Sequence, residues 1–389
     1  MKLPLSTRLF RRGPRARALG LAAAGVVTVV VGLALALPPG STPREIELGR
    51  QATQDIARSV RFIHDEEALA KLQGILDEIA VVTDRPEIRY RAHIVDSPLV
   101  NAFVIPGGWV YVTTALLDGV ESDDELAGVL AHEIAHNVRQ HAIQRIRNTP
   151  KGLGLLQLAS VAALILGKSP EAAILAGTAA NHITAAVLHG SSVAAEEEAD
   201  ADGIYYLTRT KYNPAGFLTF LESLAGSSGK FIEEELGIYA THPLTRDRVH
   251  AAEQRIKDLG VPIHRRLVTR APQPEIREVV RDGEPVTEIR YRRELLVLLQ
   301  GHDAERSAEA VRTFSWVLDY DLKESAMKVI PAEHGVLFQP EGGPPFFFTE
   351  GDGRVNGAGE VVLAGKLRSK LAALVADEQA RIRANYQLY

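Results

Sequence analysis

Apolar residues recur at helical spacing between residues 122 and 139, and this pattern predicts a helix with one buried face. The apolar stripe consists of Leu126, Val129, Leu130, Ile134 and Val138. Ser122 and Glu125 have the spacing of a capping box, and the two aspartates between them place negative charge where it complements the helix dipole. We therefore expect a helix that begins just after Ser122.

A second helix is predicted from Ala194 to Tyr206, where acidic residues are interspersed with alanines. The acidic positions are Glu196, Glu197, Glu198, Asp200 and Asp202. Residues four apart share a helical face, so Glu196 and Asp200 lie on one face and Glu198 and Asp202 on another. Either pair could be turned toward the first helix.

A β-hairpin is predicted upstream of the first helix. Two β-rich runs, Asn101 to Ile105 and Trp109 to Thr113, flank Pro106-Gly107-Gly108, and this turn needs the positive φ of glycine. The edge of such a hairpin could bind an extended polypeptide substrate by strand addition near Asn101 to Ile105.

The first helix carries the sequence His132-Glu133-Ile134-Ala135-His136. Both imidazoles lie on one face, where they can bind one metal ion, and Glu133 stands beside them as a general base. This pattern predicts a peptidase site with one zinc ion per chain. A metzincin would continue with a glycine and a third histidine, but Arg139 and Ala142 occupy those positions.

Two histidines leave a catalytic zinc one protein ligand short, because such sites use three and keep a fourth position for water. A carboxylate of the second helix is the expected third ligand. Spacing alone does not choose between Glu196 and Glu198.

The chain resembles the zinc metalloendopeptidase family that includes the CAAX prenyl proteases, HtpX and BepA, and most of all the exported BepA-like members. The resemblance covers about Glu45 to Leu259. It rests on the first motif, on the strand pair, and on Glu196, Glu198, Ala199, Asp200 and Gly203, which match a Glu-x-Glu-Ala-Asp-x-x-Gly pattern. It implies an α+β, zincin-like fold in which Glu196 is the third ligand and Asp200 orients a ligating histidine. Glu198 remains the alternative ligand.

His242-Pro243-Leu244 and Arg248 match a further segment of the family. Arg248 or His242 could stabilise the oxyanion formed during peptide hydrolysis, and we favour Arg248 for this catalytic role. The resemblance also implies an alternative, in which His242 lies near zinc and restrains the resting enzyme.

The N-terminus predicts export. Six basic residues precede an apolar run from Ala18 to Leu37, which is about as long as a membrane span. Residues 1–40 are expected to be a cleaved signal peptide, with Ala34-Leu35-Ala36 as the cleavage site, or a signal anchor that associates with the membrane. Either places the remainder in the periplasm or facing it. An arginine-rich, acid-free N-terminus also resembles a mitochondrial presequence, which is the second interpretation.

Charge and cysteine content narrow the function classes. Six of the 44 basic residues lie before residue 18, so the remainder has 38 against 49 acidic residues, formally −11. Nucleic acid is therefore not an expected partner. The absence of cysteine excludes disulfides, thiol catalysis and cysteine-ligated zinc, so zinc must be bound by imidazole and carboxylate.

Two further segments are less informative. Residues 152–190 contain two apolar stretches, and we expect a buried helical pair rather than a membrane-facing hairpin, with His182 and His189 structural. After residue 260 we expect a small α+β domain, 261–389, of unknown function. Its predicted elements are a hairpin around Asp282-Gly283, a helix from Ala304 to Leu318, a buried strand at Phe346 to Phe348, and a helix starting near Gly365.

Together these patterns predict a zinc metalloendopeptidase domain at residues 41–260 that cuts misfolded or stalled envelope proteins. The alternative is a periplasmic chaperone or assembly factor with a latent or structural zinc site. Glu133 argues against a purely structural site, because such a site needs no general base. A multi-span prenyl protease is disfavoured, since the leader is the one clear span in the sequence.

Overall fold

The computed structural model describes residues 40–148, 192–226, 242 and 246–387. The predicted leader and the apolar connection 152–190, with His182 and His189, lie outside the described residues. Within the described ranges, no helix has both the length and the apolar character that a membrane crossing requires.

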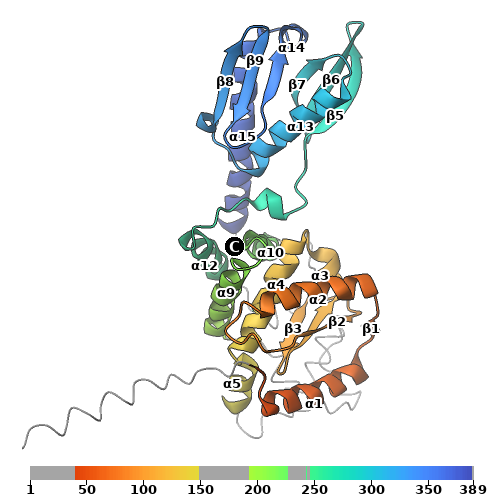
Figure 1. Ribbon diagram of the computed structural model, residues 1–389, viewed down its shortest axis with the longest axis vertical. Coiled ribbons are helices and arrows are strands. Elements are labelled where there is room, and N and C mark those ends of the chain that lie inside the picture. The colour runs from red at the N-terminus through yellow and green to blue at the C-terminus, as the bar shows by residue number, and fades with distance from the viewer. Residues whose placement is uncertain (1–39, 149–191, 227–241, 243–245, 388–389) are drawn as a thin grey trace, which may run out of the picture. The chain divides into compact units, whose positions relative to one another are not determined.

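A four-stranded sheet forms the N-terminal half, with the order β1-β2-β4-β3 (Figure 1). Its strands are β1 (Phe62–Ile63), β2 (Arg91–Val95), β3 (Ala102–Ile105) and β4 (Trp109–Thr113). The predicted hairpin is confirmed: β3 pairs with β4 in antiparallel fashion, and Gly107 and Gly108 have φ of 91° and 96°. The other neighbours are β2, which is parallel to β4, and β1, which is antiparallel to β2. Strand β3 is therefore an edge strand.

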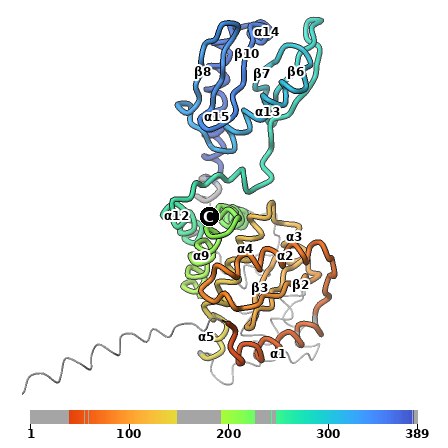
Figure 2. Tube along the Cα trace, viewed as in Figure 1, coloured from red at the N-terminus to blue at the C-terminus, as the bar shows by residue number. Residues whose placement is uncertain are grey.

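Helices cover both faces of this sheet. Helix α1 (Pro43–Ser59) packs Ala52 and Ile56 on the face that carries Phe103, Ile105 and Tyr111. Helices α2 (Glu66–Ala80) and α4 (Asp123–Val138) contact β2 and β3 from the other side, as the trace shows (Figure 2). The side chains of β3 thus alternate between the α1 face and the α4 face.

Helix α4 is the centre of this half. It packs against α9 (Val193–Leu207), α10 (Ala215–Gly226) and α2, and every residue from Glu125 to Val138 is buried. The predicted buried stripe is therefore confirmed, and neighbours enclose the other faces of the helix as well. The predicted start is confirmed, since the Ser122 hydroxyl accepts from the backbone N–H of Glu125. The second hydrogen bond of the predicted capping box is wrong: the Glu125 carboxylate accepts from the backbone N–H of Glu121 instead of that of Ser122.

Glycines allow the close approach of α4 to its neighbours. A Cβ atom on Gly128 would lie 2.7 Å from the Cα and Cβ of Phe217 in α10. A Cβ atom on Gly203 of α9 would lie 3.0 Å from the backbone N of His132. These contacts fix the distance of α9 and α10 from the helix that carries both histidines. The remaining helices of this half are α3 (Thr114–Gly119), α5 (His141–Asn148) and α12 (Arg246–Asp258).

The C-terminal half contains two three-stranded sheets, each an antiparallel meander followed by helix. The first unit comprises η1 (Arg265–Val268), β5 (Glu275–Arg281), β6 (Glu284–Tyr291), β7 (Glu294–Gln300) and α13 (Ala304–Asp319). The second comprises η2 (Glu324–Ala326), β8 (Met327–Ala332), β9 (Gly335–Pro340), β10 (Phe346–Thr349), α14 (Glu350–Val355) and α15 (Glu360–Gln387).

Most sequence predictions for this half are confirmed. The hairpin turns at Asp282 and Gly283, both with positive φ, and the helix from Ala304 ends at Asp319, one residue later than predicted. Phe346 and Phe348 are buried in β10, whereas Phe347 points outward. The last helix begins at Glu360, five residues before the predicted start.

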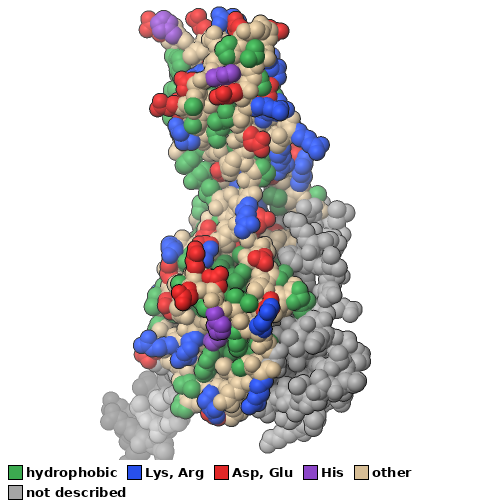
Figure 3. All heavy atoms as spheres, turned by 90° about the vertical axis from the view of Figure 1, so that its right-hand side faces the viewer, with side chains coloured by type: hydrophobic (Ala, Val, Ile, Leu, Met, Phe, Trp, Pro, Cys, Tyr) green, Lys and Arg blue, Asp and Glu red, His purple; other side chains and the backbone are tan. Residues whose placement is uncertain are grey.

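The hydrophobic core of the C-terminal half draws its buried residues from Ile289 to Val375. Residues Pro39–Tyr389 nevertheless form one contiguous unit, so the domain boundary at residue 260 stays a prediction. On the face shown in Figure 3, acidic and basic side chains are interspersed over the described surface.

We expect Gly128→Ala to lower the free energy of unfolding by about 1–3 kcal/mol, because the added methyl group overlaps the backbone of Phe217. Gly74 in α2 is the matched control: its Cβ would meet nothing within 4 Å, so Gly74→Ala should stabilise the helix by up to about 1 kcal/mol. Denaturant unfolding measures both values. Equal stability of Gly128→Ala and wild type would contradict the close packing.

Candidate metal centre

Four side chains from three segments converge in the N-terminal half. They are His132 and His136 of α4, Glu196 of α9, and His242. Each offers a possible ligand atom, and these atoms all lie within 4.8 Å of one another. The Nε2 atoms of the two α4 histidines are 3.0 Å apart, and a Glu196 oxygen lies 3.3 Å from each.

The packing of α9 on α4 produces this convergence. Histidines four apart share one face of α4, and Glu196 lies seven residues, about two turns, before Gly203 on α9. Gly203 touches the backbone at His132, so the face of α9 that contains Glu196 also faces the histidines.

The ring nitrogens of His132 show why a cation fits. Nδ1 lies 2.8 Å from Oδ1 of Asp200, and because a carboxylate only accepts hydrogen bonds, Nδ1 carries the proton. Nε2 therefore presents a lone pair to Nε2 of His136 and to the Glu196 carboxylate. Electron-pair donors that face one another in this way could hold a metal ion, which would take the place of a proton between them.

The electrostatics also favour positive charge. Burial lowers the pKa of His132, but hydrogen bonds to Asp200 and Glu196 outweigh it and raise the pKa to about 10. Burial would raise the pKa of Glu196, but His242 and the α4 histidines hold it well below its usual range. His136 shows the opposite shift: burial and the neighbouring His132 lower its pKa, so it stays neutral and can act as a ligand.

Arg248 of α12 lies behind the ligands. Its Nε and Nη2 atoms donate to the two oxygens of Asp200 at 2.8 Å, and Nη1 lies 3.0 Å from Glu196. Its guanidinium balances two buried carboxylates: burial lowers the pKa of Arg248, but the hydrogen bonds and charge of Asp200 and the charge of Glu196 outweigh it and leave the pKa above the usual value. The structure therefore places Arg248 against the candidate ligand Glu196 and against Asp200, and its oxyanion role stays a prediction.

His242 lies between the ligands and Glu133. Its Nδ1 is 3.1 Å from Glu196 and 3.2 Å from Nε2 of His132, while its Nε2 is 3.3 Å from Oε1 of Glu133. Burial raises the pKa of Glu133. His242 thus contacts both the cluster and the expected general base.

Glu198, the alternative ligand, lies outside the cluster. Its side chain is 51% exposed and contacts Nε2 of His141 at 3.1 Å and Nε of Arg139 at 3.5 Å. Asp202, on the same face, pairs with Arg139. The structure therefore brings the Glu196 and Asp200 face of α9, and not the Glu198 face, to the two histidines.

His141 is a residue of the site that the sequence analysis missed. Its Nδ1 lies 2.8 Å from Nδ1 of His136. A residue five positions after His136 would point elsewhere on a continuous helix, so helical spacing gave no signal. The structure breaks the helix at Gln140, whose φ is 59°.

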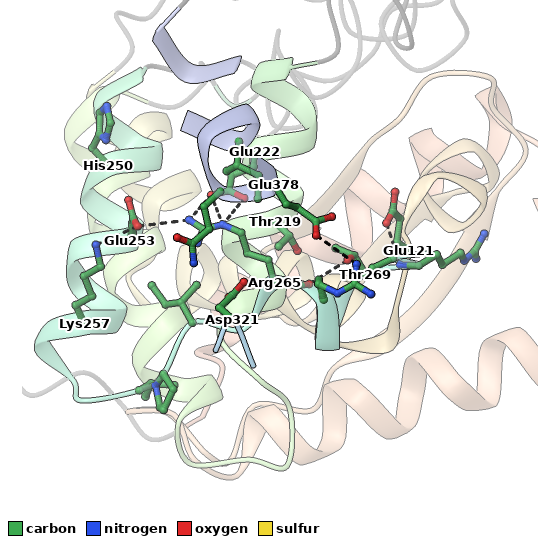
Figure 4. Close-up of a pocket in the computed structure, with 18 of the residues that line it drawn as sticks. Glu121, Thr219, Glu222, His250, Glu253, Lys257, Arg265, Thr269, Asp321 and Glu378 are labelled. Atoms are coloured by element: carbon green, nitrogen blue, oxygen red, sulfur yellow. Dashed lines mark hydrogen bonds and ion pairs between the residues drawn. The ribbon is translucent and has the colours of Figure 1, made fainter. Parts of the chain in front are cut away.

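A small cleft opens beside the cluster. It is lined by Phe103 and Val104 of β3, by Glu133, and by His242 and Arg145. A larger cavity of about 1140 Å³ lies elsewhere, lined by parts of α10 and α12, and contains none of the cluster residues. In this cavity Arg265 donates hydrogen bonds to Glu222 and Glu253 (Figure 4).

Comparison with known proteins identifies the domain. Residues 66–256 match the model of peptidase family M48. The match covers 191 of the 389 residues, and this part of the chain is similar to that family. The sequence resemblance is therefore confirmed, and so is the α+β class of the fold.

Several relatives are metalloendopeptidases. The chain is 27% identical to the mitochondrial metalloendopeptidase OMA1 of Schizosaccharomyces pombe over 187 residues, which cover 48% of this chain and 52% of the relative. It is 25% identical to the beta-barrel assembly-enhancing protease of Yersinia pestis over 222 residues, covering 56% and 45%. Over 59 residues it is 49% identical to OMA1 of Bos taurus, covering 15% and 11%. The chain spans about half the length of the first two.

We expect Glu196→Gln to lose bound metal, because an amide cannot replace the charge and lone pairs that the carboxylate directs at the histidines. Glu197→Gln, an exposed change one residue later on α9, is the matched control. Metal content after dialysis, measured by mass spectrometry, checks both. Retention of metal by Glu196→Gln would remove Glu196 from the ligand set.

We expect Arg248→Met to destabilise the metal-free protein by about 3–5 kcal/mol, because the change leaves Asp200 and Glu196 buried without their cation. Added metal should restore part of this loss, since it supplies positive charge. Thermal unfolding with and without metal measures the effect, with Arg277→Met on the exposed strand β5 as the control. A loss no larger than that of the control would show that Arg248 does not balance these carboxylates.

Proposed function

We propose that this chain is a zinc-dependent endopeptidase. The observation that carries the proposal is the convergence of His132, His136 and Glu196 beside Glu133. Imidazole and carboxylate ligands in a three-plus-one arrangement are typical of catalytic zinc. The match of residues 66–256 to peptidase family M48 supports the same activity.

Glu133 is the proposed general base. When zinc is bound, it lowers the pKa of a water molecule and polarises the scissile carbonyl. Burial raises the pKa of Glu133 above that of an exposed glutamate, which suits a group that must both accept and release a proton near neutral pH. Its carboxylate accepts the proton of the attacking water and delivers it to the leaving amine nitrogen.

We propose that the substrate is an extended polypeptide bound as an added strand near Asn101 to Ile105. Strand β3 is at the edge of its sheet and lines the cleft next to Glu133. The Glu133 carboxylate also interacts with the backbone N–H of Val104, so the edge of β3 and the general base are adjacent. A strand paired along β3 would pass its peptide bonds in front of Glu133.

We propose envelope proteins, misfolded or stalled during assembly, as substrates. The basic and apolar leader supports export to the periplasm, with or without a membrane anchor. The name of the Yersinia relative, a beta-barrel assembly-enhancing protease, is consistent with this class of substrate. A mitochondrial location is the second interpretation, which the name of the yeast relative favours.

A second candidate function is an assembly factor whose metal site is latent. The position of His242 favours this function. With Nδ1 directed at the ligands, Nε2 carries the ring proton and faces the Glu133 carboxylate. The His242 ring would thus occupy the fourth coordination position, which a water molecule needs, and it also contacts the general base. We propose that His242 restrains a competent peptidase.

We expect Glu133→Gln to reduce cleavage of casein by about 10²–10⁴-fold, because the amide cannot accept a proton. The variant should still bind zinc, since Glu133 is not one of the converging ligands. Cleavage by gel assay and zinc content measured on the same preparation test this. Equal cleavage by wild type and Glu133→Gln would point to a contaminating protease and remove the evidence for peptidase activity.

We expect His242→Ala to cleave casein faster than wild type, because the change frees both Glu133 and the fourth coordination position of the metal site. Initial cleavage rates at matched zinc content measure the effect. A slower variant that keeps its zinc would contradict restraint and assign His242 to transition-state stabilisation.

A further inference from the structure

We infer that His141 and Glu198 form a positioning pair that holds the metal ligand His136 from behind. Nδ1 of His136 lies 2.8 Å from Nδ1 of His141, and Nε2 of His141 lies 3.1 Å from Oε2 of Glu198. The inference rests on the metal site of the proposed function and deepens it.

Glu198, at the exposed end of this chain of contacts, fixes the direction of both hydrogen bonds. Glu198 can only accept, so Nε2 of His141 carries a proton and its Nδ1 presents a lone pair. That lone pair accepts the proton on Nδ1 of His136, which leaves Nε2 of His136 with a lone pair directed at the cluster. The pair therefore selects the tautomer of His136 that a metal requires.

The backbone is shaped for this contact. Helix α4 ends at Val138 and α5 begins at His141, and between them Gln140 adopts a left-handed conformation that is sterically unfavourable for a non-glycine residue. The break turns the His141 ring back onto His136, where it is 5% exposed. A continuous helix would carry His141 away from this position.

The two metal-binding histidines of α4 then have equivalent support. His132 is held by Asp200, which is fixed by Arg248. His136 is held by His141 and Glu198, and Glu198 lies beside Arg139. This assigns a role to the second glutamate of the Glu-x-Glu-Ala-Asp pattern, which faces away from the cluster.

The test measures zinc affinity by competition with a chelator, and the visible spectrum of the cobalt-substituted protein. His141→Leu cannot accept from His136, and Glu198→Leu removes the acceptor for Nε2 of His141 at a half-exposed position. We expect each to weaken zinc binding by about 10–100-fold, the usual effect of losing such a partner, and to alter the cobalt spectrum.

Two further variants separate positioning from packing. His141→Gln offers both an acceptor and a donor, so it should recover most of the affinity that His141→Leu loses. Glu197→Leu makes the same change at an exposed position of the same helix and should bind zinc as wild type does. Thermal unfolding of the metal-free proteins confirms that each variant is folded.

The outcomes are distinct. Wild-type zinc affinity and spectrum in His141→Leu and Glu198→Leu would overturn the inference alone, as would a His141→Gln variant no better than His141→Leu. Zinc binding by wild type without peptidase activity would overturn the proposed peptidase and leave the inference intact. Wild type that binds no zinc would overturn both.

Discussion

The site depends on the close packing of α9 against α4. Gly203 lets the two backbones approach at His132, and this approach brings Glu196 within 3.3 Å of both histidines. A side chain of ordinary size at residue 203 would separate the helices at the level of the ligands. The geometry of the cluster is therefore determined by backbone contact rather than by long side chains.

That packing buries several charges together, and each one needs a partner. Asp200 and Glu196 are at most 5% exposed, and Arg248 pairs with both. Isolated charges are costly in such surroundings, so a buried group of this kind persists only when its members compensate one another. A bound cation would complete the compensation, which is why metal binding and folding stability are expected to be coupled here.

His242 and His141 show two different uses of histidine around one centre. His242 reaches the cluster from the segment before α12 and contacts Glu133 as well, so it occupies space that chemistry requires. His141 lies against Nδ1 of His136, on the side of that ring away from the cluster, and joins it to Glu198. His242 is therefore placed to regulate access to the site, whereas His141 is placed to orient His136.

The sequence by itself determined the elements and the metal-binding motif. The start of α4 at Ser122, the β3–β4 hairpin and the two Gly-containing turns follow from local hydrogen bonding and backbone conformation, which neighbouring residues fix. The helical spacing of His132 and His136 likewise needs no tertiary information.

Only the tertiary structure decided which face of α9 meets those histidines. The Glu196 and Glu198 faces have identical spacing, and Gly203 favours the first because a residue without a Cβ permits close approach on that side. Long-range packing also encloses α4 completely and places Arg248 on two carboxylates. The left-handed Gln140 returns His141 to His136, a contact that no helical periodicity encodes, because it exists only where the helix is broken.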